Sequence, residues 1–288
     1  MPASFSGHWR LDGEHMNLAV FVNSSDGFQD CWQPFFELFR SYGGFLRTLP
    51  IYLNTERSQF DSGGINLEST KVWPVDETER PSWSDCLVRG MDSIKESHIL
   101  YLQEDYFLKS PVRDEVVQEA FDIFQAVPTA GVVYLSPNGP GVGKRRYYSK
   151  NFQEVCPPAH YLINTQAAIW DKKFLRSLAR RWENAWMFEK FASLRARHTT
   201  RLIFTVTPEV LNGGEIADYV WSGVMKGKWK RECVELFREH GIIADFDRRG
   251  FYYEGSLLKY RLEVLHKLFG RPIPALRSIL SLLERNGV

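Results

Sequence analysis

Two adjacent acidic residues, Glu104 and Asp105, directly follow a short apolar segment, residues 98–102, which reads HILYL and predicts a buried β-strand. In an open parallel sheet, ligands bind beyond the carboxyl ends of the strands. Carboxylate oxygens there suit Mg²⁺ or Mn²⁺, and a bound cation would hold a diphosphate and stabilise it as it leaves. Acidic residues that merely begin a solvated loop give the same pattern, so the pair needs support from other segments.

A second polar strand end lies near the beginning of the chain. Residues 17–23, NLAVFVN, predict a buried strand, which ends in Asn23 and is followed by Ser24, Ser25 and Asp26. We expect these side chains to bind the base and ribose of a nucleotide. The alternative is that they cap the helix that follows.

Two further segments are candidates for binding the same nucleotide and its diphosphate. Trp83 and Ser84 open a predicted helix, with Ser84 suited to the N-cap. Lys228 lies in a basic cluster with Lys226, Lys230 and Arg231, and cations of this kind neutralise a departing diphosphate. The alternatives are a capped helix beside a core tryptophan and a solvated basic turn. Nearby, Arg248 and Arg249 are expected at the surface.

Two carboxylates, Glu183 and Glu189, lie near the start of a helix predicted over residues 185–197. A helix N-terminus stabilises an anion. The anionic carboxylate is the form that acts as a general base and takes a proton from a sugar hydroxyl. Electrostatic capping of the helix is the alternative.

The elements that must position these residues alternate along the chain, which predicts an α/β fold with a mixed, mostly parallel central sheet flanked by helices. Strands are expected at residues 17–23, 49–54, 98–102, 130–135 and 160–170, whereas 136–158, with its glycines and prolines, predicts a loop. Helices are expected around Trp32–Phe39, from Ser84, after Pro111, at 171–182, 185–197 and 233–237, and in a C-terminal pair over 256–286.

We expect one catalytic domain over residues 16–255, with a nucleotide-binding half at 16–110 and an acceptor half at 111–255. A helical segment follows at 256–288. Its leucines beside basic residues favour either core packing or contact with a membrane surface. Residues 1–15 show no periodicity and are expected to be a disordered extension.

The 288 residues carry a net charge of +1, which provides no strong field for binding nucleic acid. The four cysteines lie far apart, without the spacing of metal ligands, and indicate reduced thiols in the cytoplasm. No apolar run approaches the roughly 20 residues of a membrane span, and a secretory leader is not expected. The expected location is the cytoplasm, including the inner face of the plasma membrane.

Several segments, in this order, resemble GT-A glycosyltransferases of bacterial capsule and lipopolysaccharide gene clusters. The resemblance covers residues 17–251 and rests on order and spacing rather than on one motif. The matching segments are FVNSSDGFQDCWQPFFELF, IYLNTE, the WS before a helix, ILYLQEDYFL, YLINTQAAIW, WENAWMFEKFASLRA, VMKGKW and the GI–D–RRG stretch.

The resemblance implies a GT-A fold and roles for particular residues. The family's DxD motif falls on Gln103-Glu104-Asp105, which makes Asp105 the expected ligand of Mn²⁺ or Mg²⁺, with Glu104 bound through water or to the ribose. Glutamine replaces the first acid, and this departure leaves the metal requirement open. By position, the general base of an inverting enzyme falls on Glu189, with Glu183 as second choice.

The resemblance also implies the reaction. Trp186 and Phe188 are expected in an acceptor pocket. The enzyme would move a sugar from a nucleotide-sugar donor to a hydroxyl of a glycan or lipid-linked acceptor in surface-polysaccharide synthesis. Two alternatives remain open: a non-catalytic carbohydrate-binding or assembly protein on the same fold, and a sugar nucleotidyltransferase. The single glycine of the Ser24–Gly27 loop disfavours the latter.

Overall fold

The computed structural model describes residues 17–283, apart from residues 138, 142, 212–213 and 255–256. The extension expected over residues 1–15 lies outside this part of the chain. Among the described residues, no helix is both long and apolar enough to cross a membrane.

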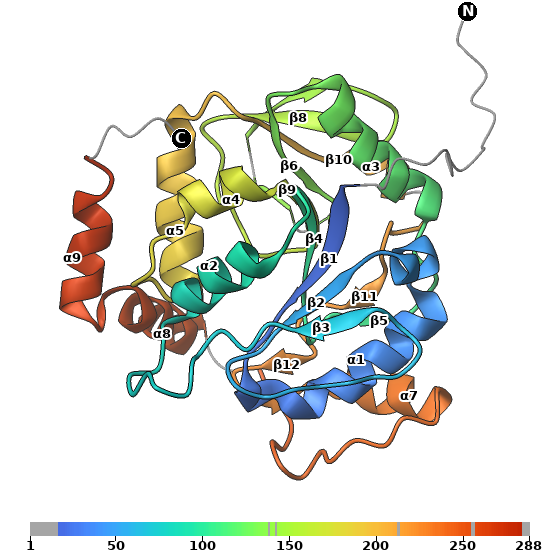
Figure 1. Ribbon diagram of the computed structural model, residues 1–288. Helices are drawn as coiled ribbons and strands as arrows, with labels where there is room; N and C mark the ends of the chain where they lie inside the picture. The colour runs from blue at the N-terminus through green and yellow to red at the C-terminus, as the bar shows by residue number, and fades with distance from the viewer. Residues whose placement is uncertain (1–16, 138, 142, 212–213, 255–256, 284–288) are drawn as a thin grey trace, which may run out of the picture.

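A nine-stranded sheet forms the centre of the described molecule, in the order β3-β2-β1-β4-β9-β6-β10-β8-β7 (Figure 1). Strands β3, β2, β1 and β4 are parallel to one another, and β6 is parallel to β10, whereas β9 runs antiparallel to both β4 and β6. Strand β8 runs against β10, and β7 against β8. The strands span Leu18–Asn23 (β1), Ile51–Asn54 (β2), Leu67–Ser69 (β3), His98–Gln103 (β4), Ala130–Tyr134 (β6), Lys144–Tyr147 (β7), Phe152–Cys156 (β8), Ala168–Asp171 (β9) and Leu202–Val206 (β10).

Two small antiparallel pairs lie outside this sheet. They join β5 (Phe107–Leu108) to β11 (Tyr219–Val220), and β12 (Val224–Met225) to β13 (Lys228–Trp229). Both pairs involve segments close to the end of β4, and this position matters for the site described below.

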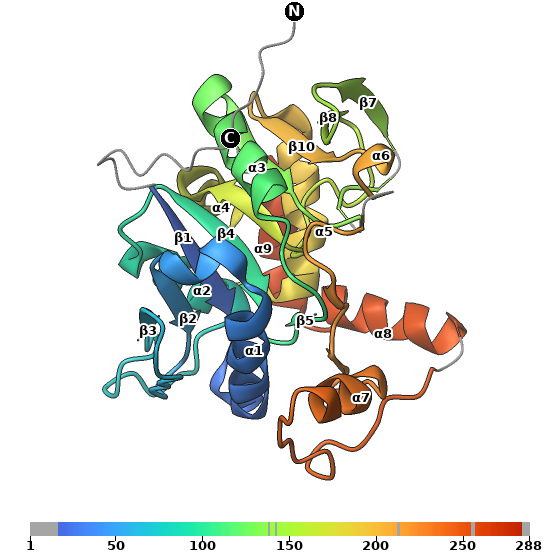
Figure 2. The same cartoon turned by 90° about the vertical axis from the view of Figure 1, so that its right-hand side faces the viewer.

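Helices cover both faces of the sheet, and Figure 2 shows the molecule from the side. They span Gln29–Tyr42 (α1), Trp83–Ser93 (α2), Asp114–Ala126 (α3), Lys172–Leu178 (α4), Ala185–Arg195 (α5), Pro208–Leu211 (α6), Glu232–Glu239 (α7), Leu257–Phe269 (α8) and Pro272–Leu280 (α9). The predicted mixed, mostly parallel sheet flanked by helices, with a helical C-terminal segment, is confirmed.

The alternation of side chains along β1 explains the two cores. Leu18, Val20 and Val22 pack into one hydrophobic cluster with α1, α3 and α7, while Ala19 and Phe21 pack into a second with α2, α4 and α5. Successive residues of a strand point to opposite faces of the sheet. A strand covered on both faces must therefore be apolar throughout, as NLAVFVN is.

Three local expectations were wrong. The predicted loop 136–158 contains β7 and β8, an edge hairpin whose exposed β7 has no apolar alternation. The strand expected over 160–170 is confined to Ala168–Asp171. The N-cap of α2 is Ser82, whose hydroxyl accepts a hydrogen bond from the Asp85 amide, rather than Ser84.

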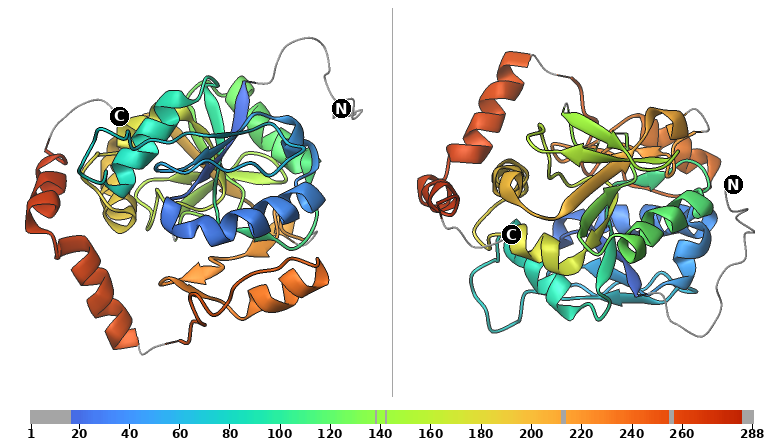
Figure 3. Two further views of the ribbon diagram at one scale, coloured as in Figure 1. Left: turned by 60° about the horizontal axis from the view of Figure 1, so that its bottom comes forward. Right: turned by 90° about the horizontal axis from the view of Figure 1, so that it is seen from above.

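The C-terminal helices α8 and α9 pack against α5 at one edge of the molecule (Figure 3). Leu268 of α8 and Ala275 of α9 form a third small cluster with Met187 and Phe191 of α5. The helices thus contact the element that carries the expected general base.

Candidate functional site

Polar side chains from three parallel strands meet at the carboxyl edge of the sheet. Asn23 of β1 lies in register with Asn54 of β2 and with Gln103 of β4. The Asn54 amide donates to Asn23 Oδ1 at 2.9 Å, and the Asn23 amide donates to the Tyr101 hydroxyl at 3.2 Å. The strand ends therefore form one rigid polar row, and the acidic pair follows directly from its third member.

Glu104 and Asp105 are both buried, with 7% and 5% of their surfaces exposed. The Val224 amide donates to Asp105 Oδ2 at 3.2 Å, and the Gly223 amide donates to the Asp105 carbonyl at 2.9 Å. Asp105 Oδ1 is buried and has no hydrogen-bond partner among the described residues. One oxygen of Asp105 is thus fixed by the β12 segment, and the other is left for a ligand.

Burial dominates the electrostatics of the acidic pair. It raises the pKa of Asp105 to about 6, while the amide of Val224 and the charges of Lys230 and Arg249 oppose the rise. The pKa of Glu104 lies well above its usual range, because of burial first and the neighbouring Asp105 charge second. A buried acid in this state ionises readily when a cation arrives beside it.

The cations nearest the acidic pair come from the C-terminal part of the chain. Arg249 was expected at the surface, and that expectation was wrong: its guanidinium binds Asp30 through two bonds of 2.6 and 2.5 Å and the Gly27 carbonyl at 2.7 Å. Its side chain is 11% exposed. Lys228 is exposed on β13, whereas it is Lys230 whose charge lowers the pKa of Asp105.

The residues at this edge fit a divalent cation in a limited way. The uncompensated buried oxygen of Asp105 is a suitable hard ligand. Among the described residues, no group of three or more His, Cys, Asp or Glu side chains could hold a metal ion. A cation here would therefore depend on oxygens from a ligand such as a diphosphate, as Mg²⁺ commonly does.

Glu189 lies in the second turn of α5 and is tied to the same edge through Thr165. The Thr165 amide and hydroxyl donate to Glu189 Oε1 at 2.9 and 2.7 Å. The Thr165 carbonyl in turn accepts from the Tyr106 hydroxyl at 2.9 Å, directly after the acidic pair. Burial raises the pKa of Tyr106 well above its usual value, and the charges of Asp105 and Glu189 add to this rise. Thr165 thus connects Glu189 to Tyr106, the residue that follows the acidic pair.

The environment of Glu189 suits a base. Burial raises its pKa above the usual value, and the two bonds from Thr165 oppose that rise. Both bonds go to Oε1, and no hydrogen bond to Oε2 is found within the described part of the chain. One oxygen is therefore oriented and the other is available to accept a proton.

Glu183 is placed differently. It is completely buried, and its two oxygens accept from the Arg195 guanidinium at 2.9 and 2.7 Å. Both members lie beneath α9, where Arg195 also donates to the Ser281 hydroxyl at 3.2 Å. This buried ion pair connects the segment before α5 to the last residue of α5. Both oxygens of Glu183 accept hydrogen bonds from Arg195.

The aromatic residues near α5 mainly support it. Phe188 is buried, and its ring centroid lies 5.5 Å from that of Trp83. These two rings line a narrow internal gap with Tyr101 and Thr165 that leaves no room for a water molecule. Trp186 is half-buried, with the Lys267 ammonium 4.4 Å from its ring centroid.

Ser84 lies at the start of α2, beside the start of α5. Its amide donates to the Glu183 carbonyl at 3.1 Å. Its hydroxyl is buried and has no hydrogen-bond partner among the described residues. The structure thus brings Ser84 close to α5 rather than to the loop after β1.

The loop after β1 is fastened to the loop after β2. Asp26 accepts from the amides of Glu56, Arg57 and Ser58 at 2.9 to 3.1 Å, and Ser24 accepts from the Trp32 indole at 2.8 Å. Ser25 lies at the N-terminus of the short 3-10 helix Asp26–Phe28 without a capping bond from its side chain. The loop is a preformed wall of the site, and Asp26 serves to hold it.

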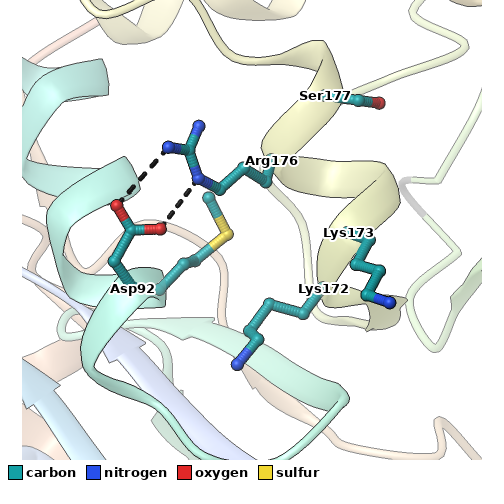
Figure 4. Close-up of a pocket in the computed structure, with 6 residues that line it drawn as sticks. Asp92, Lys172, Lys173, Arg176 and Ser177 are labelled. Atoms are coloured by element: carbon teal, nitrogen blue, oxygen red, sulfur yellow. Dashed lines mark hydrogen bonds and ion pairs between the residues drawn. The ribbon is translucent and has the colours of Figure 1, made fainter.

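A larger cavity of about 410 Å³ lies elsewhere, between α2 and α4 (Figure 4). Asp92 and Arg176, two of its lining residues, form an ion pair with a shortest distance of 2.8 Å. Another, Lys172, follows Asp171, which pairs with His98 at the amino end of β4. The cavity is therefore at the opposite edge of the sheet from Asp105.

Comparisons with known proteins are limited to the fold. No family model matches the sequence, and no curated protein matches it. Among solved structures, S. aureus TarS residues 1–349 gives a TM-score of 0.46 at 12% identity, covering 92% of this chain and 72% of that one. A CMP:2-keto-3-deoxy-manno-octonic acid synthetase complexed with CTP gives 0.39 at 14% identity, covering 65% and 88%.

Mannosyl-3-phosphoglycerate synthase from Rubrobacter xylanophilus gives a TM-score of 0.37 at 11% identity, covering 62% of this chain and 59% of that one. These scores lie below 0.5 and the identities are low. The function must therefore be argued from the residues themselves.

Proposed function

We propose that this protein is a GT-A-type glycosyltransferase that moves a sugar from a nucleotide-sugar donor to a hydroxyl of a glycan or lipid-linked acceptor. The observation that carries the proposal is the chain of contacts between the acidic pair and Glu189: Tyr106, which directly follows Asp105, donates to the Thr165 carbonyl, and Thr165 donates to Glu189 Oε1. Asp105 Oδ1 is buried without a hydrogen-bond partner among the described residues, and two nearby cations lower the pKa of Asp105.

The donor would bind at the carboxyl edge of β1, β2 and β4, where a doubly wound sheet places its ligand. Asn23 and the fastened loop with Ser24, Ser25 and Asp26 would form the nucleotide wall. Asp105, with Glu104 beside it, would hold Mn²⁺ or Mg²⁺, which supplies charge neutralisation to the departing diphosphate. Lys230 and Arg249 would stabilise the same charge, since both already lower the pKa of Asp105.

Glu189 would act on the acceptor. Its Oε2 would take the proton of the acceptor hydroxyl as that oxygen attacks the anomeric carbon of the donor sugar. The bond from that carbon to the diphosphate oxygen breaks, and the nucleoside diphosphate leaves with inversion. Thr165 would keep Glu189 oriented throughout. Glu183 is not available for this step, because Arg195 occupies both of its oxygens.

The biological setting is the finer part of the proposal. A role in capsule or lipopolysaccharide synthesis at the cytoplasmic side of the plasma membrane is supported by the resemblance of the sequence segments alone. A nucleotidyltransferase is less favoured, because the loop after β1, Ser24–Gly27, contains a single glycine where such an enzyme has a glycine-rich phosphate loop.

A thermal-shift screen with UDP, GDP, CDP and CMP and their sugars, with and without Mn²⁺, tests the proposal. A ligand that binds only the folded state raises the melting temperature. We expect one nucleoside diphosphate to stabilise the wild type in the presence of Mn²⁺ and to lose this effect in Asp105→Asn. Asp92→Asn, at the opposite edge of the sheet, is the matched control and should respond as the wild type does.

The outcomes separate the alternatives. Stabilisation without metal would retain the transferase and remove the metal role of Asp105. Glycan binding without a response to any nucleotide would favour a carbohydrate-binding or assembly protein. Hydrolysis or transfer from the stabilising sugar nucleotide, lost in Glu189→Gln, would establish catalysis.

A further inference from the structure

The two C-terminal helices expose an unusually apolar outer face. Its members are 44% to 76% exposed, although they are all large aliphatic or aromatic side chains. They are Leu262, Leu265 and Phe269 of α8, Ile273, Leu276, Ile279 and Leu280 of α9, and Leu283 just beyond it. A soluble monomer rarely leaves so many neighbouring large apolar residues in water without a partner.

The opposite face of the same helices is buried against the rest of the protein. Leu268 and Ala275 are buried against α5, and Ser278 is buried beside Trp182, whose indole donates to its hydroxyl at 3.0 Å. The exposed residues recur at three- and four-residue intervals, from Leu262 to Leu265 and from Ile273 to Leu276. Each helix therefore carries two apolar stripes, one packed toward α5 and one exposed on the outer side.

The charge of this segment is one-sided. Residues 257–283 contain five lysines and arginines but a single acid, Glu263. Glu263 forms an ion pair with Lys226 of the β12–β13 connection, so its charge is compensated. Arg261, Arg271 and Arg277 are exposed beside the apolar residues. The outer face thus combines apolar side chains with an excess of positive charge.

We propose that the outer face of α8 and α9 docks on the surface of an anionic lipid bilayer. Exposed apolar residues flanked by lysine and arginine are what an interfacial helix presents to the headgroup boundary, and neither helix is long enough to span it. A symmetric pairing of two copies through this face would bring the same cations together, which charge repulsion opposes.

Docking would place the candidate site close to the membrane. The Asn184 amide at the start of α5 donates to the Lys267 carbonyl at 2.8 Å, and Lys267 covers Trp186. The Glu263–Lys226 pair connects α8 to the hairpin that contacts Asp105. The further step, that the acceptor is lipid-linked, rests on the proposed glycosyltransferase function; vesicle binding does not.

Co-sedimentation of the full chain with vesicles tests the docking in the absence of any sugar nucleotide. We expect binding to vesicles of 70% phosphatidylcholine and 30% phosphatidylglycerol, and weaker binding to pure phosphatidylcholine or at high salt. Leu265→Glu/Leu276→Glu should weaken binding at least about tenfold, since each leucine contributes by burial. Arg261→Glu/Arg271→Glu should abolish the preference for the anionic vesicles.

The matched control is Val75→Glu/Ile243→Glu, which makes the same kind of change at two residues that are 90% and 95% exposed outside the C-terminal helices. This variant should bind vesicles as the wild type does, and all three variants should keep the wild-type melting temperature because the altered side chains are exposed. Absence of binding to anionic vesicles, or an equal loss in the control, overturns the proposal. A concentration-dependent dimer in light scattering that Leu265→Glu/Leu276→Glu dissociates would assign the face to self-association instead.

Discussion

At the scale of single residues, Asp105 and Glu189 differ in the groups that surround them. Burial raises the pKa of both. Asp105 keeps one oxygen beside two cationic residues, a setting for binding charge, whereas Glu189 is oriented by Thr165 and has no cation among the groups that shift its pKa. In the proposed function, this difference between their neighbours assigns cation binding to Asp105 and proton transfer to Glu189.

The hydroxyl of Thr165 gives a prediction about pH. Its bond to Glu189 Oε1 lowers the pKa of that carboxyl, so Thr165→Val should raise the pKa further. If Glu189 is the base, activity falls at low pH as Glu189 is protonated, and this acid limb should move to higher pH in the variant. The measurement is the pH profile of kcat/KM, with Thr205→Val as the control because its hydroxyl has no bond to Glu189. If the acid limb of the kcat/KM profile does not move in Thr165→Val, Glu189 is not the group whose protonation lowers the activity.

Glu183 and Glu189 can be distinguished by what each variant loses. Glu183→Gln leaves Arg195 buried without its full partner, so the free energy of unfolding should fall by roughly 3–5 kcal/mol while kcat at low temperature stays within a few-fold of wild type. Glu189→Gln should fold normally and lose about 10²–10⁴-fold in kcat. Chemical denaturation and initial rates measure the two effects. The reverse pattern would make Glu183 the base.

At the scale of elements, the β12–β13 hairpin completes the site from 119 residues away in the chain, through the bond between Val224 and Asp105. Gly223 permits this close approach, because a Cβ there would lie 2.3 Å from the Phe107 ring and 3.0 Å from the Asp105 carbonyl oxygen. The hairpin also brings Lys230 toward the acidic pair and leaves Lys228 exposed.

Substitutions of two lysines in this segment should therefore affect donor binding to different extents. Lys230→Met should weaken binding of the donor diphosphate by about tenfold, because a charge-assisted contact is lost. Lys228→Met removes the same charge from an exposed position and should change affinity less than twofold at physiological salt. Titration of the nucleoside diphosphate by calorimetry compares them. Equal effects would indicate a general field rather than a contact.

The sequence predicted the elements that repeat a clear pattern and missed those that do not. The apolar strands around Ala19 and Leu100, and the helix face from Trp32 to Phe39, follow from periodicity alone and are confirmed. Strand β7 was missed because the edge strand Lys144–Tyr147 is largely exposed and carries no apolar alternation. Short apolar runs such as Leu202–Val206 are also ambiguous between strand and buried helix.

For the site, position along one strand was predictable and contact between distant segments was not. The acidic pair was found because it follows β4 directly. No local pattern marks Thr165, whose contact with Glu189 joins two separate segments. Arg249 lies in a polar stretch that predicts surface exposure, and its partner Asp30 is distant in the sequence. Contacts of this kind arise from the way the chain crosses the sheet, which no local pattern encodes.

At the scale of the whole molecule, the site costs stability. The pKa of Asp105 is about 6 in the folded protein, against a usual value of 3.8, so the folded state binds more protons than the unfolded state between these values. Stability must therefore fall as the pH rises through this window, by about 3 kcal/mol in total. Under the proposed function, binding of a cation and a diphosphate would offset this cost.

The variant Asp105→Asn should make this cost visible in the metal-free protein. Asparagine can still accept the bond from Val224 but carries no charge to bury, so the variant should be more stable than wild type at pH 8 by about 2–3 kcal/mol and equal to it near pH 4. Denaturation at both pH values, with exposed Asp92→Asn as the control, measures the difference. Mn²⁺ with the nucleoside diphosphate should raise the stability of the wild type at pH 8 to that of the variant, and should leave the variant's stability unchanged. A variant no more stable than wild type at pH 8 would mean that ionised Asp105 does not destabilise the folded protein, and that its pKa is not raised by burial.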